Sequence, residues 1–197
     1  MHIFTSVTSN YIPKARVLAK SIKTFHPDAH ITLALSDSIP SWIGKGQKEE
    51  PFDAILPIED LQIPSLKSWL FKHTLVEMCT AIKPLVFQHI LNTTDAEYVL
   101  YFDPDIAVFS PLDSLVESFA RGSILLTPHQ ITPESHNQAI VDNEICSLKH
   151  GVFNLGFLGI KRSLEALAFL EWWGKRLLDY CYDDIAGGLF TDQRWID

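Results

Sequence analysis

The chain has 197 residues, of which 47% are hydrophobic and 11% aromatic, and its formal net charge is −8. This length and composition predict one folded domain with a substantial core and exclude an intrinsically disordered chain. The acidic balance, with no Lys/Arg run, argues against a nucleic-acid partner, although a few placed cations would still bind a small anionic ligand.

The cysteines and the chain start bear on the compartment. Cys79, Cys146 and Cys181 are odd in number, scattered and without CxxC spacing, so we expect no zinc site or disulfide framework and favour a reducing compartment. Residues 1–8 lack the basic region and long apolar run of a signal peptide, and no stretch reaches membrane-spanning length. The prediction is a cytoplasmic protein, with peripheral contact to the inner face of the membrane left open.

The first half of the chain predicts alternating strands and helices. An apolar strand over 3–8 is followed by Pro13, in a helix's first turn, and by apolar residues at helical spacing up to Phe25. A second strand completes a β-α-β unit, for which parallel pairing is the default. The further elements expected are this strand at 30–35, a polar loop over 44–50, a short strand over 52–57, a helix over 66–79 and a helix over 85–91 behind Pro84.

The second half continues the pattern. The expected elements are a strand over 98–102, a short helix over 113–119, a strand over 123–127, a polar loop over 130–143, a glycine-punctuated strand over 153–160 and a long helix over 163–182. Together they predict an α/β fold, a single domain over 1–197 with a mostly parallel sheet flanked by helices. Residues 194–197 resemble the opening of a helix, so we expect the chain to be incomplete at its C-terminus.

Asp103-Pro104-Asp105 is the strongest functional signal. It directly follows the apolar strand 98–102. Pro104 favours an extended backbone at Asp103, and residues two apart in an extended segment project to the same side. Two converging carboxylates repel each other unless a proton or cation lies between them. Mg²⁺ or Mn²⁺, held by one or two carboxylates together with a ligand's phosphates, suits such a pair.

Other polar side chains follow the predicted strands. Ligands of open α/β sheets bind beyond the carboxyl ends of the strands. Tyr11 could stack on a base there, Thr5 or Thr8 could hydrogen-bond its edge, and Asp37 falls at the same edge. Each residue alone also has a structural explanation, because Tyr11 can cap the core and Asp37 can cap a turn.

Five segments in this order resemble a known family: 5–11, 80–84, 101–105, 153–156 and 191–193. None is highly specific alone, but their order and spacing together are distinctive. They resemble GT-A glycosyltransferases, nearest to the family of glycogenin and the bacterial lipopolysaccharide galactosyl- and glucosyltransferases, often called family 8. The resemblance covers essentially the whole chain and implies the Rossmann-like GT-A fold.

The resemblance also implies roles for the residues of the donor site. Asp103 would contact the ribose and the metal, and Asp105 would bind the metal. Lys83 would meet the diphosphate or the donor sugar. Tyr11 would stack on a uracil-like base, with Thr8 nearby.

The remaining implied roles concern the sugar. Asn154 would hydrogen-bond it, and Asp192 and Gln193 would face its reacting carbon. The implied reaction is a metal-dependent, retaining transfer of a sugar from a nucleotide-diphosphate donor, UDP-linked, to a glycan or lipid-linked acceptor of the lipopolysaccharide type, with Mn²⁺ or Mg²⁺ as cofactor. The family takes a third metal ligand, a histidine, from a C-terminal segment that nothing in this chain matches.

Several other residues have structural explanations that we favour. His129 and His150 could be ligands, but lone histidines are more often solvated or hydrogen-bonded. Adjacent Trp172 and Trp173 predict one core residue and one at its edge. The solvated helix residues expected are Lys67 and Lys72.

Two other function classes stay open. A nucleotidyltransferase shares the α/β plan and an acidic metal site, but it usually needs a glycine-rich phosphate loop where this chain has residues 9–13. A non-catalytic module that binds a sugar nucleotide or a protein is the second. The three intact aspartates, Asp103, Asp105 and Asp192, argue against it, and the unmatched third metal ligand argues for it.

Overall fold

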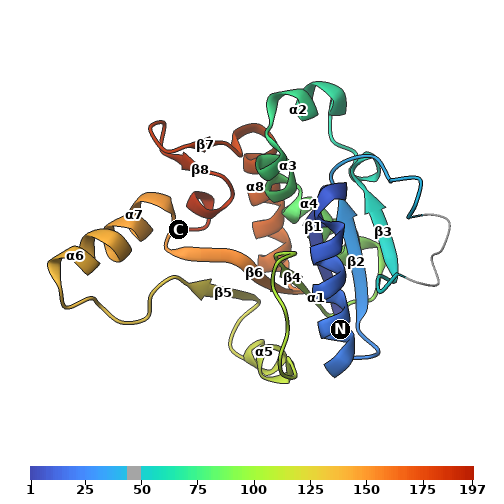
Figure 1. Ribbon diagram of the computed structural model, residues 1–197, viewed down its shortest axis with the longest axis horizontal. Helices are drawn as coiled ribbons and strands as arrows, with labels where there is room; N and C mark the ends of the chain where they lie inside the picture. Colours follow the sequence, from blue (N-terminus) through green and yellow to red (C-terminus); the bar gives the residue numbers. More distant parts are fainter. Residues whose placement is uncertain (44–49) are drawn as a thin grey trace.

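A six-stranded sheet, in the order β3-β2-β1-β4-β6-β5, forms the centre of the structure, a computed structural model that describes residues 1–43 and 50–197 (Figure 1). Its strands are β1 (His2–Val7), β2 (His30–Leu35), β3 (Ala54–Pro57), β4 (Tyr98–Phe102), β5 (Ile124–Pro128) and β6 (Phe153–Lys161). β1 pairs in parallel with β2 and with β4, and β2 with β3. β6 runs antiparallel to β4 and β5. The sheet is therefore mostly parallel, which confirms the predicted fold class.

Helices cover both faces of this sheet. The longer ones are α1 (Ile12–Phe25), α4 (Lys83–Thr93) and α8 (Leu164–Tyr180), and the shorter ones are α2 (Leu66–Lys72), α3 (Leu75–Ala81) and α5 (Asp113–Ser118). A small hairpin, β7 (Asp183–Asp184) and β8 (Leu189–Phe190), follows α8. No helix in the described parts of the chain has the length and apolar character needed to cross a membrane.

The core is divided by the sheet into two clusters. Ile3 and Val7 of β1 pack in the cluster that contains α1, whereas Phe4 packs in the cluster that contains α4 and α8. β4 alternates in the same way, with Leu100 toward α1 and Tyr101 toward α4. This alternation follows from the two-residue repeat of a strand, and it places Tyr101 and Asp103 on the α4 side.

The predicted helix over 66–79 is wrong in its continuity. The structure breaks it at His73 and Thr74 into α2 and α3. The Thr74 hydroxyl accepts a hydrogen bond from Glu77 N, and the Glu77 carboxylate accepts one from Thr74 N at 2.7 Å. This reciprocal cap starts a new helix, because it satisfies two amide groups that a helix start leaves free.

The predicted polar loop over 130–143 is also wrong in part. The structure becomes helical at α6 (Asn137–Ala139) and continues through η3 (Ile140–Ile145) and α7 (Cys146–His150). These helical turns project away from the central sheet (Figure 1). The predicted loop over 44–50 lies, except for Glu50, outside the described residues.

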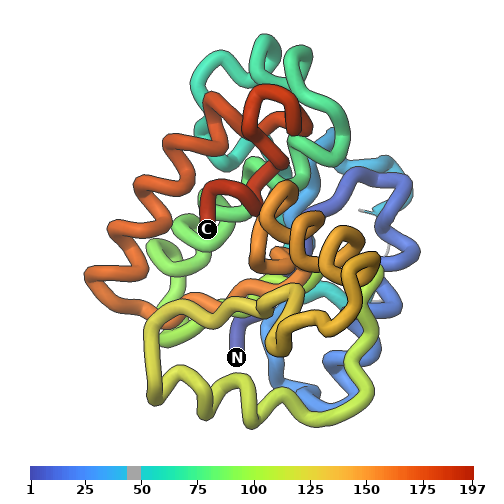
Figure 2. The backbone as a smooth tube through the Cα atoms, turned by 90° about the vertical axis from the view of Figure 1, so that its left-hand side faces the viewer, coloured from blue at the N-terminus to red at the C-terminus, as the bar shows by residue number. Residues whose placement is uncertain are grey.

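The C-terminal segment returns to the middle of the molecule. In Figure 2 its red trace ends near the middle of the molecule. Contacts far apart in sequence fix it there: Asp183 N donates to Glu77 Oε1 at 2.8 Å, and Asp192 pairs with Lys83. The segment ends in η4 (Gln193–Trp195), a single 3₁₀ turn over the residues that suggested a helix start.

Candidate functional site

The carboxyl ends of β1 and β4 meet at one edge of the sheet. Chain order reverses between these two parallel strands, since β2 lies on one side of β1 and β4 on the other. Such switch points are where α/β sheets bind ligands. A cavity of about 310 Å³ opens there, lined by Ser6, Val7, Thr8, Asn10, Tyr11, Leu75, Val76, Cys79, Thr80, Tyr101, Asp103, Pro104 and Asp105. The structure thus brings together Thr8, Tyr11, Asp103 and Asp105, as the sequence predicts.

Asp103 is held at the cavity wall by its backbone and by one carboxylate oxygen. Its N–H donates to the Gly156 carbonyl at 2.7 Å, and Tyr101 Oη donates to Asp103 Oδ1 at 2.5 Å. The Asp103 side chain is still 41% exposed, and Asp105 is exposed. Both carboxylates are therefore accessible to a ligand in the cavity.

Gly156 leaves room for the second oxygen of Asp103. A Cβ at position 156 would lie 3.0 Å from Asp103 Oδ2 and 2.9 Å from Asn154 Oδ1. The absence of a side chain keeps Oδ2 uncrowded, and two hard carboxylate ligands at the end of a strand fit Mg²⁺ or Mn²⁺. Among the described residues, no three His, Cys, Asp or Glu side chains gather as a ligand set.

Lys83, the first residue of α4, lies in a buried charge network behind Asp103. Lys83 and Asp192 are each 2% exposed, and Lys83 Nζ lies 2.7 Å from Asp192 Oδ2. Nζ also donates to the Leu155 carbonyl at 3.0 Å and lies 3.9 Å from Asp103 Oδ1. Burial alone would lower the pKa of Lys83, but Asp192 and Asp103 outweigh it and raise that pKa, so the ammonium stays charged.

Asn154 and Gln193 are engaged with the backbone of β6 and α7. Asn154 Oδ1 accepts from Gly156 N at 2.8 Å, directly beside the strand position that holds Asp103. Gln193 Nε2 donates to the His150 carbonyl at 3.2 Å, and Leu155 N approaches Gln193 Oε1 at 3.5 Å. Gln193 thereby ties the C-terminal segment to the start of β6.

The remaining predicted donor-site residues differ in accessibility. Thr5 is buried within β1 and does not line the cavity. Asp37 accepts from Ser9 N and from Ser9 Oγ, the latter at 2.7 Å, which ties the end of β2 to the turn after β1. Tyr11 is 39% exposed, and Lys14 Nζ lies 4.4 Å from the centre of its ring. Tyr11 therefore remains accessible for stacking, whereas Asp37 is occupied.

The histidines, tryptophans and lysines that we expected to have structural rather than functional roles are found in such positions. His129 Nδ1 pairs with the Gly151 carbonyl and His150 Nδ1 with the Cys146 carbonyl. Trp173 is fully buried and Trp172 is 42% exposed. Both lysines of α2, Lys67 and Lys72, are exposed.

Sequence reasoning missed several residues of the cavity. Leu75, Val76 and Cys79 were not singled out as site residues, whereas Ser6, Asn10, Thr80 and Tyr101 appeared only within longer segments and were given no role of their own. Cys79 is half-buried, and burial raises the pKa of its thiol. The threonine–glutamate cap at 74 and 77 was a readable signal for the start of α3, which supplies four of these residues.

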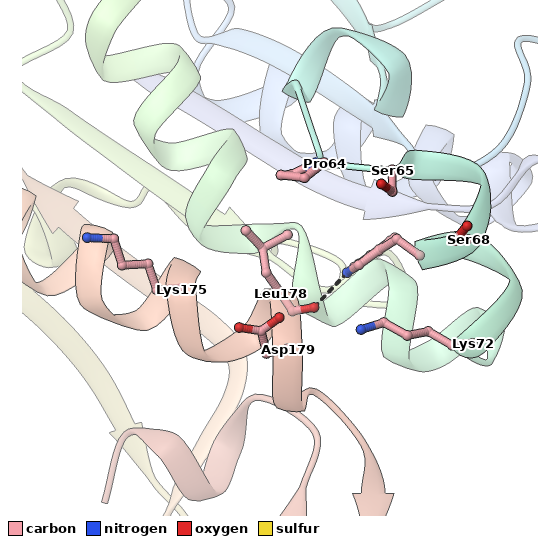
Figure 3. Close-up of a pocket in the computed structure, with 8 residues that line it drawn as sticks. Pro64, Ser65, Ser68, Lys72, Lys175, Leu178 and Asp179 are labelled. Carbon is pink, nitrogen blue, oxygen red and sulfur yellow. Dashed lines mark hydrogen bonds between the residues drawn. The ribbon is translucent and has the colours of Figure 1, made fainter.

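A second cavity, of about 350 Å³, lies between α2 and α8 (Figure 3). Trp69 and Leu178 line it, and Trp69 Nε1 donates to the Leu178 carbonyl at 2.8 Å. Lys72, Lys175 and Asp179 line it, but none of the predicted site residues does. This cavity is slightly larger than the first, but it does not lie at the strand ends, so we place the candidate site at the first cavity.

Comparison with solved structures bears on the fold. The structure superposes on that of the galactosyltransferase LgtC, solved with donor and acceptor sugar analogues, with a TM-score of 0.60 and 19% identity over all of this chain and 69% of LgtC. The chain has the GT-A fold. The Mn/GDP form of core-mannan synthase A from Aspergillus fumigatus matches with a TM-score of 0.54 and 10% identity, over 97% of this chain and 70% of that one. The fold expected from the sequence resemblance is confirmed.

Sequence comparisons add a distant relative. The uncharacterized protein YfnD of Bacillus subtilis strain 168 is 23% identical over 201 residues, which cover all of this chain. The chain spans 61% of the length of YfnD. No family model matches the sequence.

Proposed function

We propose that this GT-A chain transfers a sugar from a nucleotide-diphosphate donor, UDP-linked, with a divalent cation at Asp103 and Asp105. One observation carries the proposal: these two accessible carboxylates share a cavity with Tyr11 and Thr8 at the switch point of the sheet. A base stacked on Tyr11 and a diphosphate near the aspartates would both lie in that cavity. The acceptor we propose is a glycan or a lipid-linked glycan. We propose that the transfer takes place in the cytoplasm or at the inner face of the membrane.

The chemistry requires stabilisation of a departing diphosphate. Mn²⁺ or Mg²⁺ bound by Asp103 and Asp105 would supply Lewis-acid stabilisation of that negative charge. Lys83 already balances Asp192, so we assign it a role in holding Asp103 and the C-terminal segment, rather than the diphosphate contact that the sequence resemblance implied.

We assign Asp192 and Gln193 to the sugar-facing part of the site, as the sequence resemblance implied, although neither side chain lines the cavity in this structure. They lie behind Asp103 and beside β6, on the segment that Lys83 fixes. A polar or anionic group near an oxocarbenium-like carbon stabilises it. We therefore propose these two residues as the candidates that face the reacting carbon. We also propose that the transfer retains the configuration at that carbon.

Calorimetric titration with UDP tests the proposal, in the presence and absence of Mn²⁺. The wild-type chain should bind UDP more tightly with Mn²⁺ than without it. In Asp105→Asn the affinity for UDP with Mn²⁺ should be lower by about tenfold or more, because the substitution removes a charged metal ligand. Asp28→Asn, in an exposed turn at the opposite edge of the sheet, is the matched control and should bind as the wild type does. Equal Mn²⁺-dependent binding by wild type and Asp105→Asn would refute the proposal.

A second candidate, a module that binds the sugar nucleotide without turning it over, is favoured by the burial of Asp192. A carboxylate that is 2% exposed and paired with Lys83 does not reach the cavity in this structure. Hydrolysis of a UDP-sugar separates the two candidates. A catalytic site should release UDP slowly with water as acceptor, and a binding module should hold the donor intact.

A further inference from the structure

Tyr101 connects the two charged parts of the site. It is the fourth residue of β4, is 2% exposed, and packs in the core through its ring, 5.0 Å from the ring of Phe4. Its ring centre lies 4.4 Å from Lys83 Nζ. Its hydroxyl reaches past the end of the strand and donates to Asp103 Oδ1 at 2.5 Å.

The contacts on Asp103 are asymmetric. Both the Tyr101 hydroxyl and the Lys83 ammonium approach Oδ1, at 2.5 and 3.9 Å. Oδ2 lies over Gly156, where a Cβ would come within 3.0 Å of it. Among the described residues, no hydrogen-bond donor is directed at Oδ2, so the two oxygens of this carboxylate have different surroundings.

This asymmetry matters for a cation. A carboxylate that rotates freely offers either oxygen, and it loses that freedom when it binds a metal. A donor fixed on one oxygen orients the ligand before the metal arrives, and partners of this kind typically contribute 10–100-fold to metal affinity.

We propose that Tyr101 is a positioning residue, whose hydroxyl holds Oδ1 of Asp103 and so leaves Oδ2 as the oxygen that ligates the divalent cation. The proposal rests on the proposed function of Asp103 and Asp105 as metal ligands. The ring of Tyr101 has a separate, structural role against Phe4 and Lys83, and only the hydroxyl acts on the metal site.

Tyr101→Phe separates the hydroxyl from the ring. The experiment measures Mn²⁺ binding in the presence of saturating UDP by electron paramagnetic resonance, UDP binding without metal by calorimetry, and the thermal midpoint. Tyr101→Phe should bind Mn²⁺ about tenfold more weakly. Any loss in metal-free UDP affinity should be clearly smaller than the loss in Mn²⁺ affinity, a pattern that general disruption of the cavity would not give.

Tyr98→Phe is the matched control. Tyr98 begins the same strand, and its ring stacks on Phe119 at 5.5 Å, at the end of β4 opposite to Asp103. Removal of this hydroxyl should leave Mn²⁺ binding unchanged. Gly156→Ala tests the other oxygen of Asp103 independently, because its methyl group would crowd Oδ2, and it should also weaken Mn²⁺ binding.

The outcomes are distinguishable. If the wild type binds no Mn²⁺ with UDP, the proposed function fails and the role of Tyr101 fails with it. If the wild type binds Mn²⁺ and Tyr101→Phe binds it equally well, the positioning role is overturned while the metal site stands. If Tyr101→Phe does not fold, unchanged Mn²⁺ binding by Gly156→Ala would overturn the assignment of Oδ2.

Discussion

Asp192 and the Asp103-Pro104-Asp105 turn are two acidic regions on either side of Lys83, and the protein uses them in opposite ways. Asp192 is 2% exposed, and its Oδ2 lies 2.7 Å from Lys83 Nζ, so its charge is balanced inside the protein. Asp105 is exposed, and Asp103 keeps 41% of its side-chain surface. The difference shows that burial and pairing, rather than residue type, decide which carboxylates hold the chain together and which remain available to a ligand.

The largest expected effect comes from breaking the buried pair. Lys83→Met should lower the free energy of unfolding by about 3–5 kcal/mol, because Asp192 is left buried without its partner. Urea unfolding measures this change. Lys161→Met, which removes one partner of the more exposed pair with Glu97, is the control and should cost less than about 1 kcal/mol.

The double variant sharpens this test. Lys83→Met combined with Asp192→Leu should be less destabilised than Lys83→Met alone, because no unpaired charge then remains in the interior. If the loss in the double variant instead equals the sum of the losses in Lys83→Met and Asp192→Leu, the two residues act independently and do not form one pair.

Glu77 is a second buried carboxylate with partners inside the protein, and its expected effect is smaller. It accepts hydrogen bonds from Thr74 N and Asp183 N at 2.7 and 2.8 Å. Burial raises the pKa of Glu77, but these N–H groups outweigh it, and the net pKa is lowered. A lowered pKa in the folded state means that the stabilisation is present above the unfolded value, about 4.3, and is lost as pH falls through the folded value.

Glu77→Gln should therefore destabilise the protein at pH 7 by about 2 kcal/mol, and by less in acid. Urea unfolding at pH 7 and at a pH below the folded pKa checks both parts. Glu97→Gln, at an exposed residue, serves as the control. A loss for Glu77→Gln that does not vary with pH would contradict a role for the ionised carboxylate.

The smallest effect on stability is expected at the open carboxylates. Asp105→Asn should change the free energy of unfolding by no more than about 0.5 kcal/mol, as is usual for a surface substitution. The same urea experiment measures it. A loss of several kcal/mol would place Asp105 among the structural carboxylates and remove it from the candidate metal site.

The fold was largely predictable because its strands are local patterns. The apolar runs of β1, β2, β4 and β6 are visible in the sequence, and Asp103-Pro104-Asp105 directly follows one of them. The helical turns over 137–143 were misread as part of a loop because polar residues dominate this stretch, and the turns over 144–150 were not assigned. Val141, Ile145 and Leu148 recur there at helical spacing, but they stay exposed.

The pairing within the site was not predictable. Lys83 and Asp192 are 109 positions apart, and they meet only because α4 and the C-terminal segment are packed around β4 and β6. The same holds for the close approach of Asp103 to Gly156, which depends on the antiparallel pairing of β4 with β6. Motif spacing identified these residues, but it did not show which charges are buried.

A crystal structure with UDP and Mn²⁺ bound tests the central claim most directly. The account predicts a manganese ion in contact with the carboxylates of both Asp103 and Asp105, the diphosphate on the same ion, the base against Tyr11, and the Lys83–Asp192 pair intact. A nucleotide in the cavity between α2 and α8, or an ion that touches neither aspartate, would contradict it.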